Sequence, residues 1–285
     1  MRSNGDAVDG PGSSGGRARR FERVRLWLRI LSRLKGQGRR MRVGLVASAF
    51  LDIALFATVP SRATSPRTYV AGVVSSDRPA ARFRVRSGTD DIYNVMPRRE
   101  ADVDDYIRGH LGSGDTFVDV GANAGYYSVV AGRIVGPRGR VVSIEPVPET
   151  FELLRENVAL NGLGNVATFA NACWNAREGL TMTLPGGYYG LASLATPLGG
   201  RRIPVEAIPL DALTADLPSV QVLKVDAEGA ELEVLEGAAD TLAKTRFAVL
   251  EVTRNRARVE ALLQRHSFSM ERSRNYPSYV FAARR

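Results

Sequence analysis

The chain contains 285 residues, of which 44% are hydrophobic, and it carries a formal net charge of +9. This length and composition suffice for one domain with a full hydrophobic core and a smaller appendage. A single cysteine, Cys173, excludes an internal disulfide bond and a cysteine zinc cluster. With only His110 and His266 present, a histidine-rich site is not supported either, and we predict no metal site.

The positive charge is concentrated near the N-terminus. Residues 1–60 contain 12 Lys and Arg against 4 Asp and Glu, whereas residues 61–285 contain 27 against 26. A folded domain that binds DNA or RNA needs several clustered cations. Because most of the chain is close to neutral, we expect no nucleic-acid partner.

The N-terminal part begins with a tail and a basic segment. Residues 1–20 are rich in glycine, serine and charge, so we predict a disordered tail. Residues 21–35, FERVRLWLRILSRLK, place apolar side chains at helical spacing among arginines, which is typical of a basic amphipathic helix. Such a helix either lies on an anionic membrane surface or docks on protein, and the pattern leaves both open.

The next segment, residues 39–63, begins with twin arginines and continues as an apolar run over 43–59. The run is shorter than the roughly 20 residues of a membrane span, and it contains Asp52, which would be costly inside a bilayer. We interpret it as a buried or peripheral helix, with export or anchoring as the alternative. Residues 21–69 are thus predicted to be helical, with a contact to a membrane surface through 21–59.

From residue 70 onward the sequence predicts one α/β domain, 70–285. A strand at 81–87 and a helix-like stretch ending at residue 111 come first. Strands and helices then alternate, which predicts parallel strands joined by helical crossovers. The strands are expected at 116–120, 140–146, 165–171, 220–226 and 247–252, with helices at 148–160 and 229–244. Two last strands, 268–273 and 278–284, are close enough to form a hairpin.

A ligand loop is predicted after the strand at 116–120, in the stretch TFVDVGANAGYYSVVAG. In doubly wound sheets, ligands lie beyond the carboxyl ends of the strands, and these ends carry Asp119, Glu145 and Asp226. Glu145 follows Gly125 by 20 residues, the offset at which a carboxylate binds ribose hydroxyls. By itself, Gly121-x-x-x-Gly125 is also consistent with a turn that binds nothing.

The loop disfavours a dinucleotide, because Asn123 stands where a pyrophosphate-binding loop has its middle glycine. S-adenosylmethionine has no phosphate and carries sulfonium and ammonium cations, which Asp119 suits electrostatically. A second motif, LKVDAEGAELEVLEGA at 223–238, places Lys224 and Asp226 on one strand face. The acids that follow are also explained by a helix dipole, but a buried lysine–aspartate pair points to a site.

Three blocks of the sequence resemble the FkbM family of S-adenosylmethionine-dependent methyltransferases: FVDVGANAGYYS, SIEPVPETFELLRENVALNGL and LKVDAEGAELEVLEGA. GTDDIYNVMPRRE and IPLDAL are also similar, and the resemblance spans residues 82–251. It implies a class I methyltransferase fold, a seven-stranded, mostly parallel sheet with helices on both faces and a C-terminal antiparallel hairpin. It also implies methylation of a hydroxyl on a sugar, glycan or polyketide-type small molecule.

The resemblance also implies roles for residues that match the family's motifs. On the methionine side of S-adenosylmethionine it places Asp119, Gly121, Asn123 and Gly125. It places Glu145 at the ribose, and Asn171 and Ala172 near the adenine.

For methyl transfer, an acceptor oxygen must be aligned and relieved of its proton. Asp226 is our candidate general base, Lys224 would orient it or the acceptor, and Glu228 would bind substrate hydroxyls. His110 is an alternative base, although packing is its more common role, and acidic ligands for a metal remain an alternative.

Two further hypotheses stay open: methylation of another atom or of a macromolecule, and a cofactor-binding protein without catalysis. Tyr126 and Tyr127 are expected to fill the core. For Tyr188 and Tyr189, stacking on sugar faces and filling the core are both open. S-adenosylmethionine is made in the cytoplasm, so we predict a cytoplasmic enzyme whose N-terminal helices touch the membrane. The sequence does not indicate an oligomeric state.

Overall fold

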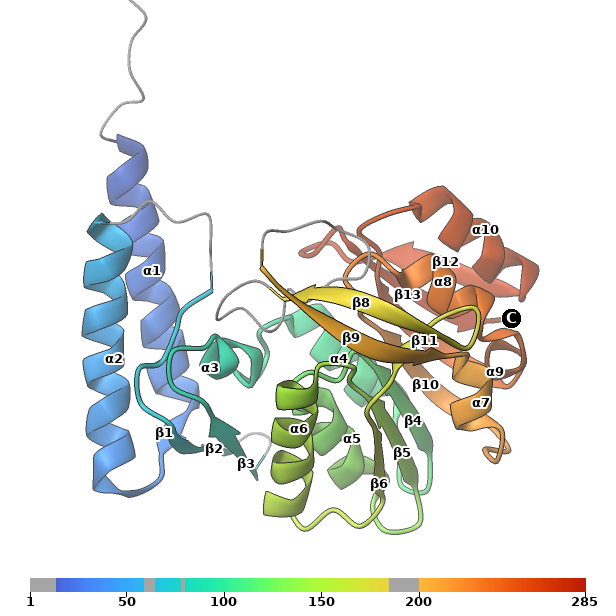
Figure 1. Cartoon of the computed structure of the whole chain (residues 1–285), viewed down its shortest axis with the longest axis horizontal. Helices are drawn as coiled ribbons and strands as arrows, with labels where there is room; N and C mark the ends of the chain where they lie inside the picture. Colours follow the sequence, from blue (N-terminus) through green and yellow to red (C-terminus); the bar gives the residue numbers. More distant parts are fainter. Residues whose placement is uncertain (1–13, 59–64, 78–79, 185–199) are drawn as a thin grey trace, which may run out of the picture.

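The computed structural model describes residues 14–58, 65–77, 80–184 and 200–285. Its centre is a seven-stranded sheet with the strand order β12-β13-β11-β10-β4-β5-β6 (Figure 1). The bounds of these strands are β4 (Thr116–Val120), β5 (Arg140–Ile144), β6 (Val166–Phe169), β10 (Val220–Val225), β11 (Thr245–Glu251), β12 (Phe268–Arg272) and β13 (Tyr279–Arg284).

The direction of the strands confirms the predicted fold class. Strands β4, β5, β6, β10 and β11 pair in parallel. Strand β13 is antiparallel to both β11 and β12, so it alone runs against the other six. The C-terminal hairpin predicted from the sequence is therefore present.

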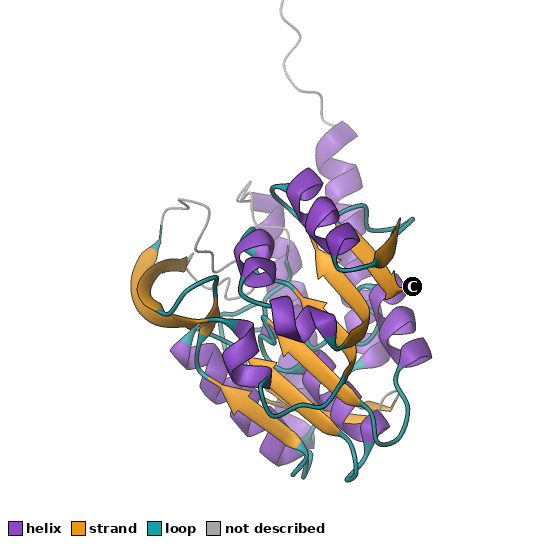
Figure 2. Ribbon diagram, turned by 90° about the vertical axis from the view of Figure 1, so that its right-hand side faces the viewer, coloured by secondary structure: helices purple, strands orange, loops and turns teal. Residues whose placement is uncertain are grey.

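Helices cover both faces of this sheet (Figure 2). One face carries α4 (Ala101–His110), α5 (Tyr126–Val135) and α6 (Pro148–Leu160), and the other α7 (Leu210–Thr214), α8 (Glu231–Glu236), α9 (Ala239–Ala243) and α10 (Arg256–Arg265). Successive strand residues alternate between the two cores: Phe117 belongs to one and Val118 to the other. Because both faces are covered, the strands are almost continuously apolar.

The single helix predicted over 229–244 is wrong, since α8 and α9 are separate. A Cβ atom at Gly237 would lie 2.1 Å from the carbonyl oxygen of Trp174. The break therefore occurs where another segment approaches the backbone too closely for a side chain.

A second, three-stranded sheet was not predicted. It consists of β7 (Ala172–Cys173), β8 (Glu178–Leu184) and β9 (Arg201–Ile208) in the order β7-β9-β8. Residues 185–199, which connect β8 to β9 and include Tyr188 and Tyr189, lie outside the described residues.

The N-terminal part forms a helical hairpin on a small sheet. Helices α1 (Ser14–Arg33) and α2 (Gly38–Thr58) lie side by side (Figure 1), and β1 (Lys35–Gly36), β2 (Gly72–Asp77) and β3 (Ala80–Val85) form the sheet. The helix α1 starts at Ser14, so the prediction that residues 14–20 are disordered is wrong. Arginine and alanine are strong helix formers, and RARR at 17–20 lets the helix extend toward the N-terminus.

The hairpin shares its core with the rest of the chain. Trp27 and Ile30 of α1 and Leu45 of α2 belong to the same hydrophobic cluster as Val74 and Phe83. Strand β1 also pairs with β2, so the boundary predicted between residues 69 and 70 divides a shared sheet.

Asp52, the acid inside the apolar run, holds the two helices together. Its carboxylate is 2.7 Å from Arg23 Nε and accepts a hydrogen bond of 2.7 Å from Trp27 Nε1. Asp52 is 4% exposed and Arg23 6%, so this ion pair is buried. Within the described ranges, no helix has both the length and the apolar character that crossing a membrane requires.

Candidate active site

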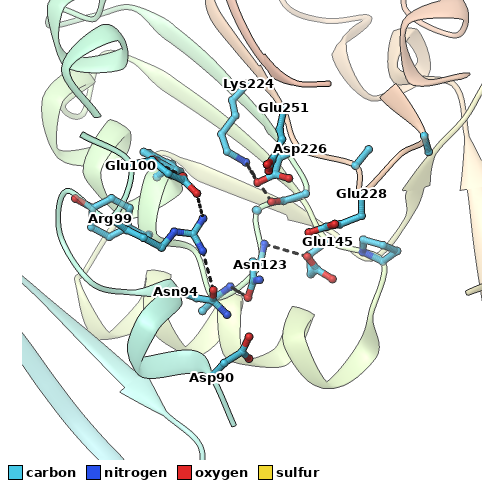
Figure 3. Close-up of a pocket in the computed structure, with 18 of the residues that line it drawn as sticks. Asp90, Asn94, Arg99, Glu100, Asn123, Glu145, Lys224, Asp226, Glu228 and Glu251 are labelled. Carbon is cyan, nitrogen blue, oxygen red and sulfur yellow. Dashed lines mark hydrogen bonds and ion pairs between the residues drawn. The ribbon is translucent and has the colours of Figure 1, made fainter. Parts of the chain in front are cut away.

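A cavity opens at the carboxyl ends of β4, β5, β10 and β11, where the sequence predicts a ligand (Figure 3). One side of its wall comes from the loops after these strands, and the other from the chain between β3 and α4, which includes α3 (Asp91–Asn94). The polar wall and its loop consist of Asp90, Asn94, Arg99, Glu100, Gly121, Asn123, Glu145, Lys224, Asp226, Glu228 and Glu251.

The loop after β4 owes its shape to residues in the left-handed region. Gly121 has φ 73°, and a Cβ atom there would lie 1.9 Å from the carbonyl oxygen of Asp226. Asn123 has φ 50°, which asparagine tolerates better than most residues, and its Oδ1 accepts a hydrogen bond from Ala124 N. Gly121 therefore lets the loops after β4 and β10 meet, and both Gly121 and Asn123 line the cavity.

Gly125, by contrast, does not line the cavity. It has φ 86° and precedes α5, where a Cβ atom would lie 2.7 Å from Leu154 Cδ1 of α6. Its role in this structure is to let α5 begin close to α6.

Glu145 stands at the end of β5 and faces the loop. Its two carboxylate oxygens accept hydrogen bonds of 2.9 Å from the backbone N–H groups of Asn123 and Val147. Burial raises its pKa to about 7, although both N–H donors favour the ionised form. Each carboxylate oxygen has a second lone pair, so Glu145 can still accept hydrogen bonds from two neighbouring hydroxyls.

Lys224 connects two of the predicted acids. It lies opposite Asp119 in the β10–β4 register, and its Nζ is 3.2 Å from Asp119 Oδ1 and 3.4 Å from Asp226 Oδ2. Burial acts to lower the pKa of Lys224, but these two carboxylates outweigh it and raise the pKa above its ordinary value. Ser128 Oγ donates to the other oxygen of Asp119. Asp119 is fully buried beneath the cavity, where it positions Lys224, and it is not part of the wall.

Glu228 and Glu251 surround Asp226 with further negative charge. Burial first, and then the charge of Asp226, raises the pKa of both glutamates. Glu228 also has φ 48°, an unusual backbone conformation for a non-glycine residue. Glu251 accepts hydrogen bonds of 3.2 Å from Ser278 Oγ and Tyr279 OH. No group of three or more His, Cys, Asp or Glu side chains in the described residues is arranged to hold a metal ion.

The wall opposite these strands was missed by sequence reasoning. Arg99 donates to Asn94 Oδ1 at 2.8 Å and lies 2.7 Å from Glu100 Oε1, while Glu100 Oε2 accepts from Tyr127 OH. Asp90 is 2% exposed, and within the described residues its Oδ1 has no hydrogen-bond partner. Burial, followed by repulsion from the neighbouring acid on α3, raises the pKa of Asp90 to about 6.

Glu251 was also missed. It could have been found from the sequence, because it lies near the end of a predicted strand, as Asp226 and Glu145 do. Asp90, Arg99 and Glu100 fall in or near the segment GTDDIYNVMPRRE, which is similar to the family, but nothing in their spacing indicated a role.

Two further sequence candidates, like Gly125 and Asp119, lie away from the cavity wall. Asn171 is half-buried between β6 and β7 and does not line the cavity, whereas the adjacent Ala172 does. His110 packs between the rings of Tyr106 and Phe247, at centroid distances of 4.3 and 4.0 Å. The packing role is therefore the one that the structure supports for His110.

Tyr126 and Tyr127 are buried, as predicted, and both also reach the cavity wall. Cys173, a further wall residue, is buried, and burial raises the pKa of its thiol to about 12.

The strand order, the single antiparallel strand and a cavity beyond the strand ends are those of the class I methyltransferase fold. The family model described as "Methyltransferase FkbM domain" matches residues 119–276, more than half of the chain. The protein belongs to the FkbM methyltransferase family.

Three similar proteins have methyltransferase names. The hexuronic acid methyltransferase AglP of Haloferax volcanii is 28% identical over 177 residues, which cover 61% of this chain and 70% of that protein. The methyltransferase sdnD of Sordaria araneosa is 28% identical over 206 residues, covering 59% and 79%. Among solved structures, an S-adenosylmethionine-dependent O-methyltransferase of Thermotoga maritima has 15% identity and a TM-score of 0.41, covering 74% of this chain and 77% of that chain.

Proposed function

We propose that this methyltransferase acts in the cytoplasm and methylates a hydroxyl of a sugar, glycan or polyketide-type small molecule, with S-adenosylmethionine as donor. The observation that carries the proposal is one cavity with Glu145 beside the glycine loop and Asp226 held by Lys224. The carboxylate of Glu145 suits the hydroxyls of a ribose, and the carboxylate of Asp226 suits a reacting hydroxyl. The name of the relative AglP supports a sugar acceptor.

The residues of the cavity fit the proposed cofactor. Glu145 would accept hydrogen bonds from its ribose hydroxyls, Gly121 and Asn123 would lie along its chain, and Ala172 would lie near its adenine. Its ammonium group would meet Asp90, whose buried Oδ1 otherwise has no partner among the described residues. When bound, S-adenosylmethionine supplies a methyl group on a sulfonium sulfur, and the sulfur is a good leaving group because it departs as a neutral thioether.

The protein's own part in the reaction is to place the acceptor and remove its proton. The side chain of Asp226 is 15% exposed, so it reaches the cavity, and Lys224 holds it from below. We assign Asp226 as the general base that takes the hydroxyl proton. Glu228 and Glu251, whose raised pKa values favour a proton on one of them, would donate to or accept from neighbouring hydroxyls.

The charge of the wall favours a hydroxylated small molecule over a nucleic acid. Among the described residues, the cavity is lined by six acids and by two basic side chains, Arg99 and Lys224, and both basic groups are paired with acids. Phosphate groups would be repelled by this wall, whereas carboxylates accept hydrogen bonds from hydroxyls.

The cofactor assignment is tested by calorimetric titration of the full chain with S-adenosylmethionine. The full chain is needed because α1, β1 and α2 share the core and sheet of the domain. We expect micromolar binding by the native protein and a loss of about 1–3 kcal/mol in Glu145→Ala, which removes the ribose contact. Glu152→Ala, an exposed acid on α6, is the matched control and should bind normally.

The acceptor is tested by supplying labelled S-adenosylmethionine with panels of sugars, uronic acids, polyketides, peptides and RNA. Methyl transfer to a sugar or polyketide hydroxyl supports the proposal. Transfer to a peptide, to RNA or to a nitrogen would establish the alternative acceptors. Micromolar cofactor binding without transfer to any panel would favour a binding protein without catalysis.

A further inference from the structure

The large apolar side chains that are most exposed all lie on one part of the described chain, the hairpin of α1 and α2. They are Phe21, Leu28, Val43, Val46, Phe50, Leu51 and Leu55, with exposed fractions between 42% and 73%. Elsewhere in the described ranges, large apolar side chains are buried or only partly exposed. A concentration of this kind marks an interaction surface more often than chance exposure.

The residues on α2 form a stripe. Val43, Val46 and Phe50 are separated by three and four residues, and Leu51 extends the same face, so their side chains lie on one side of the helix. The opposite side of α2 carries Met41, Leu45, Ser48 and Asp52, all of which are buried. The stripe therefore faces away from the rest of the described chain, and Figure 1 shows α2 at the left edge of the molecule.

The orientation of α2 is fixed by its buried polar contacts. Arg23 and Trp27 of α1 both bind the carboxylate of Asp52, and Ser48 Oγ accepts a hydrogen bond of 2.9 Å from the backbone N–H of Tyr69. Turning the stripe inward would carry Asp52 to the outside and leave Arg23 buried without its partner, which is strongly unfavourable. The exposed face is thus a stable feature of the hairpin.

Arginines accompany the stripe. Arg39 and Arg40 are exposed and precede Val43 by four and three residues, which places them on the same face of α2, one turn earlier. Arg25 and Arg29 are exposed on α1. We call the stripe together with Arg39 and Arg40 the outer face of α2.

We propose that the outer face of α2 docks on an anionic lipid bilayer. The apolar stripe would lie at the boundary between headgroups and acyl chains, and the arginines would lie among the anionic headgroups. A second copy of the chain is the competing occupant. Parallel pairing of two such faces would bring their arginines together, which like charges oppose, and antiparallel pairing would place the arginines beside a helix face that carries no exposed acid. The helix would lie on the bilayer and not cross it, because none of the described helices combines the length with the apolar character of a membrane span.

This surface is independent of the proposed function. It is formed only by α2, and none of its residues lines the cavity. Binding to lipid can therefore be measured whether or not the acceptor is a sugar.

The test is sedimentation of the full chain with vesicles of phosphatidylcholine, alone or mixed with phosphatidylglycerol. We expect the native protein to bind the mixed vesicles on the order of tenfold more tightly, and less tightly at high salt. Arg39→Glu with Arg40→Glu should remove that preference. Arg138→Glu with Arg265→Glu, two exposed arginines outside the hairpin, makes the same charge change and should retain it.

A second pair of substitutions, Val46→Ser with Phe50→Ser, removes apolar area and should weaken binding to the mixed vesicles on the order of tenfold. Because both side chains are exposed, circular dichroism should show an unchanged fold. The proposal is overturned if the native protein ignores the mixed vesicles or binds both kinds equally. It is also overturned if the protein is a dimer that this pair of substitutions converts to a monomer, which would make the face a subunit interface.

Discussion

Buried acids and bases are balanced in the helical hairpin, whereas in the cavity the acids outnumber the bases. In the hairpin, the carboxylate of Asp52 meets Arg23, Trp27 and the backbone N–H of Arg67, so an acid and a base are matched with a full set of donors. In the cavity, Lys224 is shared between Asp119 and a group of acids that outnumber it.

The difference shows what each arrangement can do. A matched pair holds one geometry and has no binding capacity left, whereas an excess of carboxylates is unfavourable until a hydroxyl, a cation or a proton reaches it. Burial and then the charge of Asp226 raise the pKa values of Glu228 and Glu251, which is the sign of that excess. The pKa of Glu145 is raised to about 7 by burial. Charge at the hairpin fixes how α1 and α2 pack, whereas charge at the cavity leaves capacity for the ligands that we propose.

The largest effect is expected on the cavity side, for Asp226→Asn. Loss of the proposed general base should lower kcat by about 10²–10⁴-fold, while the dissociation constant for S-adenosylmethionine changes little, because Glu145 and the glycine loop are intact. Steady-state kinetics with calorimetry would separate the two. Asp216→Asn, at an exposed acid, is the control. If Glu251→Gln lost more activity than Asp226→Asn, the base would be Glu251.

The largest effect on the hairpin side is expected for Asp52→Ala. The change leaves Arg23 buried without its partner, and we expect the free energy of unfolding to fall by about 3–5 kcal/mol. Urea denaturation of the full chain measures it. Replacing both members, Arg23→Met with Asp52→Leu, should recover most of the loss, because the cost comes from the unpaired charge. A loss that persists in the double variant would mean that the hydrogen bond from Trp27 matters more.

A smaller, pH-dependent effect is expected for Glu228→Gln. Burial and Asp226 raise the pKa of Glu228 above 4.5, so the folded protein binds this proton more tightly than the unfolded chain does. The resulting stability is complete below pH 4.5 and is lost as the pH rises. Glutamine cannot ionise, so the variant should match the native protein at pH 4 and exceed it by about 1–3 kcal/mol at pH 8.

Urea denaturation at several pH values would check this prediction. Glu152→Gln, whose exposed side chain belongs to an i,i+3 ion pair, should show no such increase in stability relative to the native protein as the pH rises. A constant gap between Glu228→Gln and the native protein at every pH would contradict the proposed repulsion.

Much of the fold could be predicted because its signals are local. The helix α6 has the bounds predicted from its proline start, and the terminal hairpin follows from two strands joined by four residues. The sheet of β8 and β9 was missed, although Arg201–Ile208 alternates between exposed and buried positions along much of its length. The break at Gly237 could not be predicted, because it depends on Trp174, 63 residues earlier in the chain.

The residues of the site likewise fall into those that could be predicted from the sequence and those that could not. Glu145 and Asp226 were predictable from a general rule about strand ends, and Glu251 obeys the same rule. The burial of Asp119 depends on the register between β4 and β10, which places Lys224 beside it and which the sequence does not state. Asp90 and Arg99 reach the cavity only because the chain before α4 folds across the strand ends.

The smallest effect is expected for Lys35→Ala, which removes an exposed ion pair from the hairpin side. Lys35 Nζ lies 2.5 Å from Asp77 Oδ2, but the two side chains are 67% and 72% exposed, so water and salt screen their attraction. We expect the free energy of unfolding to fall by less than about 1 kcal/mol. A double-mutant cycle with Asp77→Ala, read by urea denaturation, isolates the pair. A coupling as large as that between Arg23 and Asp52 would mean that burial is not what separates the two ion pairs, whereas a small coupling would show that exposure makes this ion pair weak.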